Sequence, residues 1–282
     1  MKPISRRAFL RSLTAGTILI GGGPLLYAST IEPHSLEIVE QTIPLRGLGG
    51  GFEGFRVVQL SDLHAGQWID RAQLKRAFEL AHDLSPDLVV ITGDFLTKDT
   101  DYIEAAEDLT STISILSGAV PVLAVRGNHD HGRRESTLSE VFAQTGITEL
   151  ENSFHTIHRG GDILHFAGID SVSTGHQGLG KVVDEAPTDA PVILLAHEPD
   201  MADFSAPTER FVLQVSGHSH GGQINLPYIR SLTLPWMGEK YPAGLYQVGN
   251  MLQYTNRGIG MTHLPFRMNC RPEITVHTFI PA

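Results

Sequence analysis

The chain has 282 residues, of which 41% are hydrophobic and 18% charged, so it is long enough to bury one sizeable core. The formal net charge of −10 argues against non-specific nucleic-acid binding, and no nucleic-acid partner is expected. The single cysteine, Cys270, excludes an internal disulfide framework and any zinc site built from cysteines.

The first thirty residues have the pattern of a targeting sequence rather than of part of the folded domain. The run SRRAFLR (5–11), with paired Arg6 and Arg7, resembles a twin-arginine export signal. The apolar stretch after it is short for a membrane-spanning helix and is interrupted by a GGGP run. The small residues that end at Ala28 or Thr30 match a cleavage site only weakly, so a cleaved signal peptide and an uncleaved membrane anchor both stay open.

This N-terminal segment predicts where the protein works. Residues 1–30 hold four cations and no acids, so the rest of the chain carries a charge of −14. The twin-arginine pathway carries folded proteins, which suits a chain that acquires something before export. We expect an exported protein, periplasmic or anchored on the outer side of the cytoplasmic membrane. Its expected partners are the twin-arginine machinery and, as a further candidate, the membrane surface.

The body of the chain alternates apolar strand patterns with helical patterns and then becomes richer in strands. Helical stripes are expected at 70–84, 102–117 and 135–145, two of them closed by Gly118 and Gly146. Strands are expected at 55–60, 87–92, 120–125, 154–158, 163–169, 191–196, 211–216, 245–248, 252–255 and 274–280. The pattern predicts an α/β fold with a βαβ half and a β-rich half around one core.

Five polar clusters each follow an apolar strand: SDLH (61–64), GD (93–94), GNHD (127–130), HEP (197–199) and GHSH (217–220). The carboxyl ends of parallel strands share one edge of a sheet, and ligands bind there. The side chains expected to converge at that edge are Asp62, His64, Asp94, Asn128, His129, His197, His218 and His220.

These residue types indicate a metal site. Several imidazoles, two carboxylates and one amide, without a thiolate, suit Mn²⁺, Fe or Zn²⁺ better than soft copper or Mg²⁺ alone. The donors are too many for one ion but suffice for two if one carboxylate bridges. Two ions about 3.5–4 Å apart can clamp the attacking and leaving oxygens of a phosphoryl displacement.

Taken singly, most of the motifs have a plainer interpretation. Asp-x-His and Gly-Asp are common in surface turns, and HEP alone reads as a helix start with Pro199 in its first turn. GNHD and GHSHGG are stronger, because glycines beside imidazoles let the backbone approach ions. The five clusters in this order, each after a buried strand, favour a functional site.

The series DLH, GD, GNHD, H and GHSHGGQ resembles the calcineurin-like metallophosphoesterase superfamily over residues 55–225. The twin-arginine start and the Gly-Gly-Gln after GHSH resemble its exported or membrane-associated bacterial branch. The resemblance implies a β-sandwich of mixed sheets flanked by helices, with the catalytic domain over 55–282, a linker and first strand region over 31–54 and the signal or anchor over 1–30. It implies that one metal is held by Asp62, His64, Asp94 and His220. It implies that the other is held by Asp94, Asn128, His197 and His218, so that Asp94 bridges.

His129 is then not a ligand, and we expect it to act as the catalytic acid on the leaving oxygen. The leading hypothesis is a hydrolase of phosphodiester or pyrophosphate bonds that uses two divalent ions (Mn, Zn or Fe). Its substrate would be a phosphorylated small molecule or lipid, such as a lipid-linked or nucleotide-sugar component of the envelope. The alternatives are a phosphomonoesterase and a non-catalytic metal-binding envelope protein.

Weaker candidates surround this core. His176 can line the mouth of the site, and Arg257 and Arg267 can contact a phosphate, although pairing with carboxylates explains both arginines equally well. Residues 226–246 form a long loop after GHSHGGQ that can cap the site or touch an acyl chain. The remaining histidines, His263 among them, are expected to be structural or solvated.

Overall fold

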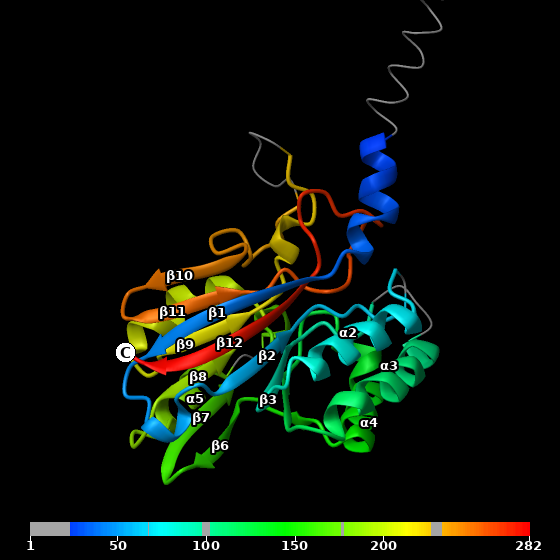
Figure 1. The fold of residues 1–282 in the computed structure, drawn as a ribbon. Helices are drawn as coiled ribbons and strands as arrows, with labels where there is room; N and C mark the ends of the chain where they lie inside the picture. Colours follow the sequence, from blue (N-terminus) through cyan, green and yellow to red (C-terminus); the bar gives the residue numbers. More distant parts are fainter. Residues whose placement is uncertain (1–22, 67, 98–101, 176–177, 227–232) are drawn as a thin grey trace, which may run out of the picture.

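A computed structural model describes residues 23–66, 68–97, 102–175, 178–226 and 233–282 (Figure 1). The paired arginines and His176 lie outside the described residues. Within those ranges, no helix combines the length and the apolar character that crossing a membrane requires.

Two six-stranded mixed sheets form the centre of the fold (Figure 1). In spatial order the first sheet contains β1 (Glu37–Leu45), β12 (Glu273–Pro281), β2 (Arg56–Leu60), β3 (Leu88–Thr92), β4 (Val122–Val125) and β5 (Thr148–Glu149). The second contains β10 (Gly244–Val248), β11 (Met251–Thr255), β9 (Leu213–Ser216), β8 (Val192–Leu195), β7 (Asp162–Gly168) and β6 (Ser153–Arg159).

Helices cover the outer faces of both sheets. The first sheet carries α2 (Arg71–Asp83), α3 (Tyr102–Ser117) and α4 (Glu135–Thr145), which lie together on one face in Figure 1. The second carries α5 (Leu179–Glu185) and the short α6 (Ala202–Ser205). The expected β-sandwich of mixed sheets flanked by helices is therefore confirmed.

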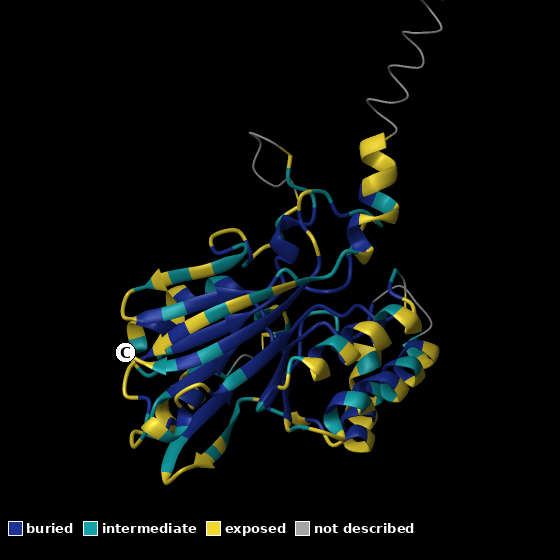
Figure 2. Cartoon of the chain, in the orientation of Figure 1, coloured by how far each residue is buried: buried dark blue, intermediate teal, exposed yellow. Residues whose placement is uncertain are grey.

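Side chains that alternate between the two faces of each strand explain why both faces of the sheets are apolar. In β2, Val57 packs between the two sheets whereas Val58 packs beneath the helices, and Val90 and Ile91 of β3 divide in the same way. Successive side chains of a strand point to opposite faces, so a strand buried on both faces reads as a continuous apolar run. The buried strands and the exposed outer surfaces of the helices are visible in Figure 2.

The expected elements appear close to their predicted bounds. Helix α2 begins after Asp70, whose carboxylate accepts from the backbone N–H of Gln73 in a capping box. Helix α4 ends at Gly146, which has the left-handed φ of 71° that favours glycine at this position. Strand β1 lies in the segment 31–54 and pairs in parallel with β12, which joins the start of the described body to its end.

Candidate metal centre

All five polar clusters lie at the carboxyl ends of strands, as the sequence predicts. Strands β2, β3 and β4 run parallel in the first sheet, and β8 and β9 run parallel in the second. The loops after them meet across the sandwich: the backbone N–H of His218, after β9 of the second sheet, donates to the carboxylate of Asp62, after β2 of the first, at 3.1 and 3.0 Å. The fold thus brings the eight predicted side chains to one place.

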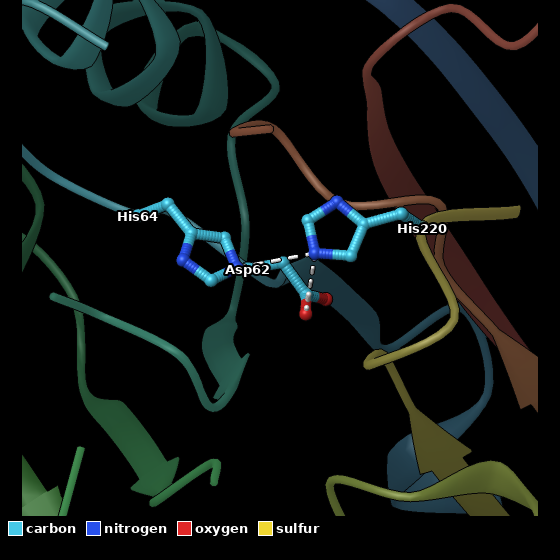
Figure 3. A group of neighbouring side chains, drawn as sticks. All are labelled: Asp62, His64 and His220. Atoms are coloured by element: carbon cyan, nitrogen blue, oxygen red, sulfur yellow. Dashed lines mark hydrogen bonds and ion pairs between the residues drawn. The ribbon is translucent and has the colours of Figure 1, made fainter. Parts of the chain in front are cut away.

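The first cluster contains Asp62, His64 and His220, all buried (Figure 3). The two Nε2 atoms of His64 and His220 are 3.1 Å apart, and His220 Nε2 is 3.3 Å from Asp62 Oδ1. The backbone N–H of His218 donates to both oxygens of Asp62, at 3.1 and 3.0 Å, and so fixes its carboxylate. Two imidazole nitrogens and one carboxylate oxygen therefore point at a common centre.

The second cluster contains His197 and His218 together with Asn128. His197 Nδ1 donates to the carbonyl of Thr92 (2.6 Å), and His218 Nε2 donates to the carbonyl of Trp236 (2.9 Å). In the neutral rings the other nitrogens, His197 Nε2 and His218 Nδ1, then carry lone pairs, yet they lie only 3.2 Å apart. The amide oxygen of Asn128 lies 3.3 Å from His197 Nε2. Electron-pair donors that converge in this way fit a cation.

Asp94 lies between the two clusters. Its Oδ2 is 3.5 Å from His64 Nε2 of the first cluster and 3.3 Å from His197 Nε2 of the second. Its Oδ1 accepts from the backbone N–H of His129 at 2.8 Å, which fixes the orientation of the carboxylate. One oxygen of Asp94 is therefore within reach of both groups, the arrangement that a shared ligand requires.

The charges in the centre also suit cations. Burial raises the pKa values of Asp62 and Asp94, but neighbouring imidazoles, His220 for Asp62 and His197 for Asp94, outweigh it and hold both well below their usual range. Burial lowers the pKa of His64 to about 3, so this imidazole is a neutral donor. Burial also opposes charge on His197, yet the carboxylates of Asp94 and Asp62 raise its pKa. The second cluster therefore attracts positive charge, which a divalent cation would supply.

The backbone of the centre is strained. Five residues of the clusters have the left-handed φ that non-glycine residues rarely adopt, with values between 46° and 67°: Asp62, His64, Asp94, His218 and His220. Such conformations cost on the order of 1–3 kcal/mol each and persist only where surrounding structure imposes them. The strain is concentrated where the donors converge, which supports a functional interpretation of the clusters.

Two residues of the stretch GNHD, Gly127 and Asp130, have separate structural roles. A Cβ on Gly127 would lie 2.2 Å from Asp94 Oδ1, so only glycine leaves room for the shared carboxylate. Asp130 is buried and accepts from the backbone N–H groups of Gly127, Phe95 and Leu96, at 2.9, 2.8 and 3.2 Å. Burial and the nearby charge of Asp94 raise the pKa of Asp130 to about 7. Asp130 holds the turn itself.

A cavity of about 320 Å³ opens beside the centre, and His129 lines it with Asp94, Asn128, His218 and His220. The ring of His129 meets that of His64 edge-on, with centroids 4.8 Å apart. A nitrogen of His129 lies within 4.8 Å of donor atoms of His64 and Asp94. A small movement of the His129 side chain would therefore change it from an acid that faces the cavity to a metal ligand.

Sequence reasoning missed the other wall of this cavity. Thr262, His263 and Leu264 line it, although His263 was expected to be structural or solvated. Gln223 fixes this wall, because its Nε2 donates to the carbonyls of Thr262 (3.0 Å) and Leu264 (2.9 Å). In the sequence, the glutamine that follows GHSHGG, Gln223, was the one feature that pointed to this wall of the cavity.

Three other polar side chains have structural partners. Arg257 forms ion pairs with Glu37 and Glu273, and buried Arg267 donates to backbone carbonyls that include those of Arg257 and Gly258. Glu198 of the HEP run is buried and accepts from the Ser171 hydroxyl and the Val172 N–H. Ion pairs and hydrogen bonds within the fold thus account for both arginines.

The fold and the paired clusters define a class of metal-dependent hydrolases with a two-ion centre. Residues 55–222 match the family described as calcineurin-like phosphoesterase, and the chain belongs to this metallophosphoesterase family of hydrolases. It is 35% identical to the uncharacterized metallophosphoesterase YkuE of Bacillus subtilis (strain 168), over 99% of this chain and 98% of that protein.

Two further comparisons are consistent with this result, one in sequence and one in fold only. The chain is 29% identical to phosphodiesterase YaeI of Escherichia coli (strain K12), over 97% of this chain and 98% of that protein. A dimetal phosphatase from Danio rerio shares the fold with a TM-score of 0.51 at 12% identity, over 81% of this chain and 100% of that one.

Proposed function

We propose that the protein is a binuclear metal-dependent hydrolase of phosphodiester or pyrophosphate bonds that works outside the cytoplasm. The observation that carries the proposal is Asp94, whose Oδ2 lies within 3.5 Å of imidazole nitrogens from both clusters. The expected ligands are Asp62, His64, Asp94 and His220 for one ion and Asp94, Asn128, His197 and His218 for the other. When bound, the ions would activate water and neutralise charge on the phosphoryl oxygens.

The donor set favours some ions over others. The two clusters offer imidazole nitrogens, carboxylate oxygens and one amide oxygen, and the single thiol of the chain, in Cys270, is not among the candidate ligands. Mixed nitrogen and oxygen donors suit Mn²⁺, Fe or Zn²⁺. We propose one of these, in both positions, as the native cofactor.

The chain's own residues then orient the substrate and supply a proton. His129 lines the cavity beside both clusters, where an imidazolium can protonate the leaving oxygen as the phosphorus–oxygen bond breaks. The hydrogen bonds of Asp130 hold the turn that presents His129, and Gln223 holds the opposite wall. A positioned acid of this kind contributes about 10²–10⁴-fold to the rate.

The cavity favours a diester over a monoester. Its described lining residues include no lysine or arginine, so beyond the ions and His129 the second negative charge of a monoester has no cationic partner there. Leu234, Pro235 and Leu264 also line the cavity and suit a substrate with an apolar part. The name of the Escherichia coli relative, a phosphodiesterase, supports the same preference.

A substrate panel tests the proposal. The full chain, loaded with Mn²⁺, Fe²⁺ or Zn²⁺ in turn, is assayed on bis-(p-nitrophenyl) phosphate, p-nitrophenyl phosphate and a UDP-sugar lipid, with bound metal counted in parallel. We expect two ions per chain and faster turnover of the diester or the pyrophosphate than of the monoester. Preference for the monoester would make the protein a phosphomonoesterase, and two bound ions without turnover of any substrate would indicate a metal-binding protein.

A further inference from the structure

We propose that the protein keeps its N-terminal segment and rests on a phospholipid surface, with the mouth of the catalytic cavity beside the lipid. The surface involved, the apolar rim, consists of exposed side chains from three segments: Leu25, Leu26, Tyr27, Ile31, Trp236 and Leu264. The inference deepens the proposed function, because it states where the same site meets its substrate.

The rim is exposed although it is apolar. Its six side chains expose between 42% and 64% of their surface, and Leu26 (62%) and Trp236 (64%) expose the most. In Figure 1 the helix at residues 23–30, in blue, lies at the same end of the molecule as the loop that contains residues 262–268. Exposed apolar side chains that gather around a functional opening indicate an interaction surface.

Hydrogen bonds connect each segment of the rim to the site. The carbonyl of Trp236 accepts from His218, a candidate metal ligand, at 2.9 Å. Leu264 lines the cavity, and its carbonyl accepts from Gln223. The same loop reaches the N-terminal helix, because the backbone N–H of Arg267 donates to the carbonyl of Ala28 at 2.9 Å. The rim therefore continues from the cavity onto the helix.

The packing of the helix argues against removal of the segment before it. Residues 23–30 are helical, and Ala28, one of the two weak cleavage positions, is only 1% exposed. The carboxylate of Glu32 is buried just beyond and accepts from the backbone N–H of Cys270 at 2.5 Å. Cleavage after Ala28 would divide this packed segment, so we infer that the folded protein retains it.

Charge and composition select a lipid surface as the occupant. The chain before residue 23 has four cations, no acids and an apolar stretch, whereas the rest of the chain has a net charge of −14. Cations followed by apolar residues suit anionic headgroups and acyl chains, and an acidic protein partner would not account for the apolar part. Tyr27 and Trp236 are of the aromatic types enriched at membrane interfaces.

Fluorescence of the full chain tests the orientation. The sequence contains two tryptophans, so Trp68→Phe leaves Trp236 as the sole reporter. With vesicles of phosphatidylcholine and phosphatidylglycerol we expect Trp236 emission to shift to shorter wavelength, and brominated acyl chains should quench it. Leu26→Glu should weaken vesicle partitioning about tenfold or more while hydrolysis of a soluble diester stays unchanged.

His158 provides the matched control, since it is exposed near the end of β6, a strand that lies at the opposite end of the molecule from the N-terminal helix in Figure 1. With Trp68 and Trp236 both changed to Phe, the reporter in His158→Trp should remain unquenched. Equal quenching at both positions, or none at Trp236, would overturn the proposal, as would a shift that depends on protein concentration and not on vesicles. Cleavage after Ala28 or Thr30, seen in the intact mass of membrane-recovered protein, would also overturn it. The partitioning, quenching and mass measurements do not need turnover, so failure of the hydrolase proposal is a separate result.

Discussion

Asp94→Asn removes the carboxylate expected to bridge the two ions while preserving the shape of the side chain. Asp94 Oδ1 accepts from the backbone N–H of His129 at 2.8 Å, and Oδ2 faces imidazole nitrogens of His64 and His197 at 3.5 and 3.3 Å. An amide has one oxygen, so it cannot serve both sides. With the oxygen toward His129, the NH₂ group occupies the position of the shared ligand. With the oxygen toward the ions, two donors face each other, which costs about 1–3 kcal/mol.

Both orientations of the amide weaken the binding of both ions, so metal content and activity should fall together. The electrostatic contribution of a bound ion is worth several kcal/mol, so we expect activity to fall at least ~10³-fold, which corresponds to ~4 kcal/mol. The assay is metal content by mass spectrometry of the purified variant beside turnover of bis-(p-nitrophenyl) phosphate.

Asp130→Asn is the matched control, because Asp130 is equally buried and accepts three backbone N–H groups but lies outside the clusters. It should lose stability, since its new NH₂ group faces at least one N–H donor, and still bind two ions. Two ions and near-normal turnover in Asp94→Asn would refute the bridging role. Equal metal loss in both variants would show that the effect is one of folding.

Four further outcomes are expected. His129→Ala should keep both ions and lose most activity on an ester with a basic leaving group but less on p-nitrophenyl esters; loss of an ion would make His129 a ligand instead. Gly127→Ala pushes a Cβ to 2.2 Å from the shared carboxylate, so kcat should fall about 10²-fold with most of the structure retained by circular dichroism. Burial lowers the pKa of His277 from its ordinary 6.5 to about 3, so between these values only the unfolded chain takes up this proton. The stability that neutral His277 contributes is therefore fully present above pH 6.5, and the free energy of unfolding falls by up to ~1.4 kcal/mol per pH unit as the pH drops toward 3. In chemical unfolding of the metal-free protein, His277→Phe should show a shallower dependence of this free energy on pH. Arg6→Lys with Arg7→Lys should leave the protein in the cytoplasm; unchanged export in a fractionation assay would contradict the twin-arginine signal.

The sequence alone determined the local structure and the donor set. Apolar runs such as 87–92 predict buried strands, and the cap at Asp70 and the apolar stripe of α2 are recognisable in nearby residues of the sequence. Because each polar cluster directly follows such a strand, the order of elements was sufficient to predict that the clusters lie at the carboxyl ends of strands, which the structure divides between the two sheets. Local information fixes these features, since each depends on residues a few positions apart.

Only the tertiary structure decided how the two sheets face each other. Asp62 and His218 are 156 positions apart, yet the backbone N–H of His218 fixes the Asp62 carboxylate, and no periodicity predicts that contact. The same holds for the cavity wall at residues 262–264 and for the helix at 23–30, which meets the loop near Arg267. These contacts depend on the packing of the two sheets against each other. Because the apolar faces of both sheets are buried in the sandwich, loops that are distant in the sequence become neighbours at its end.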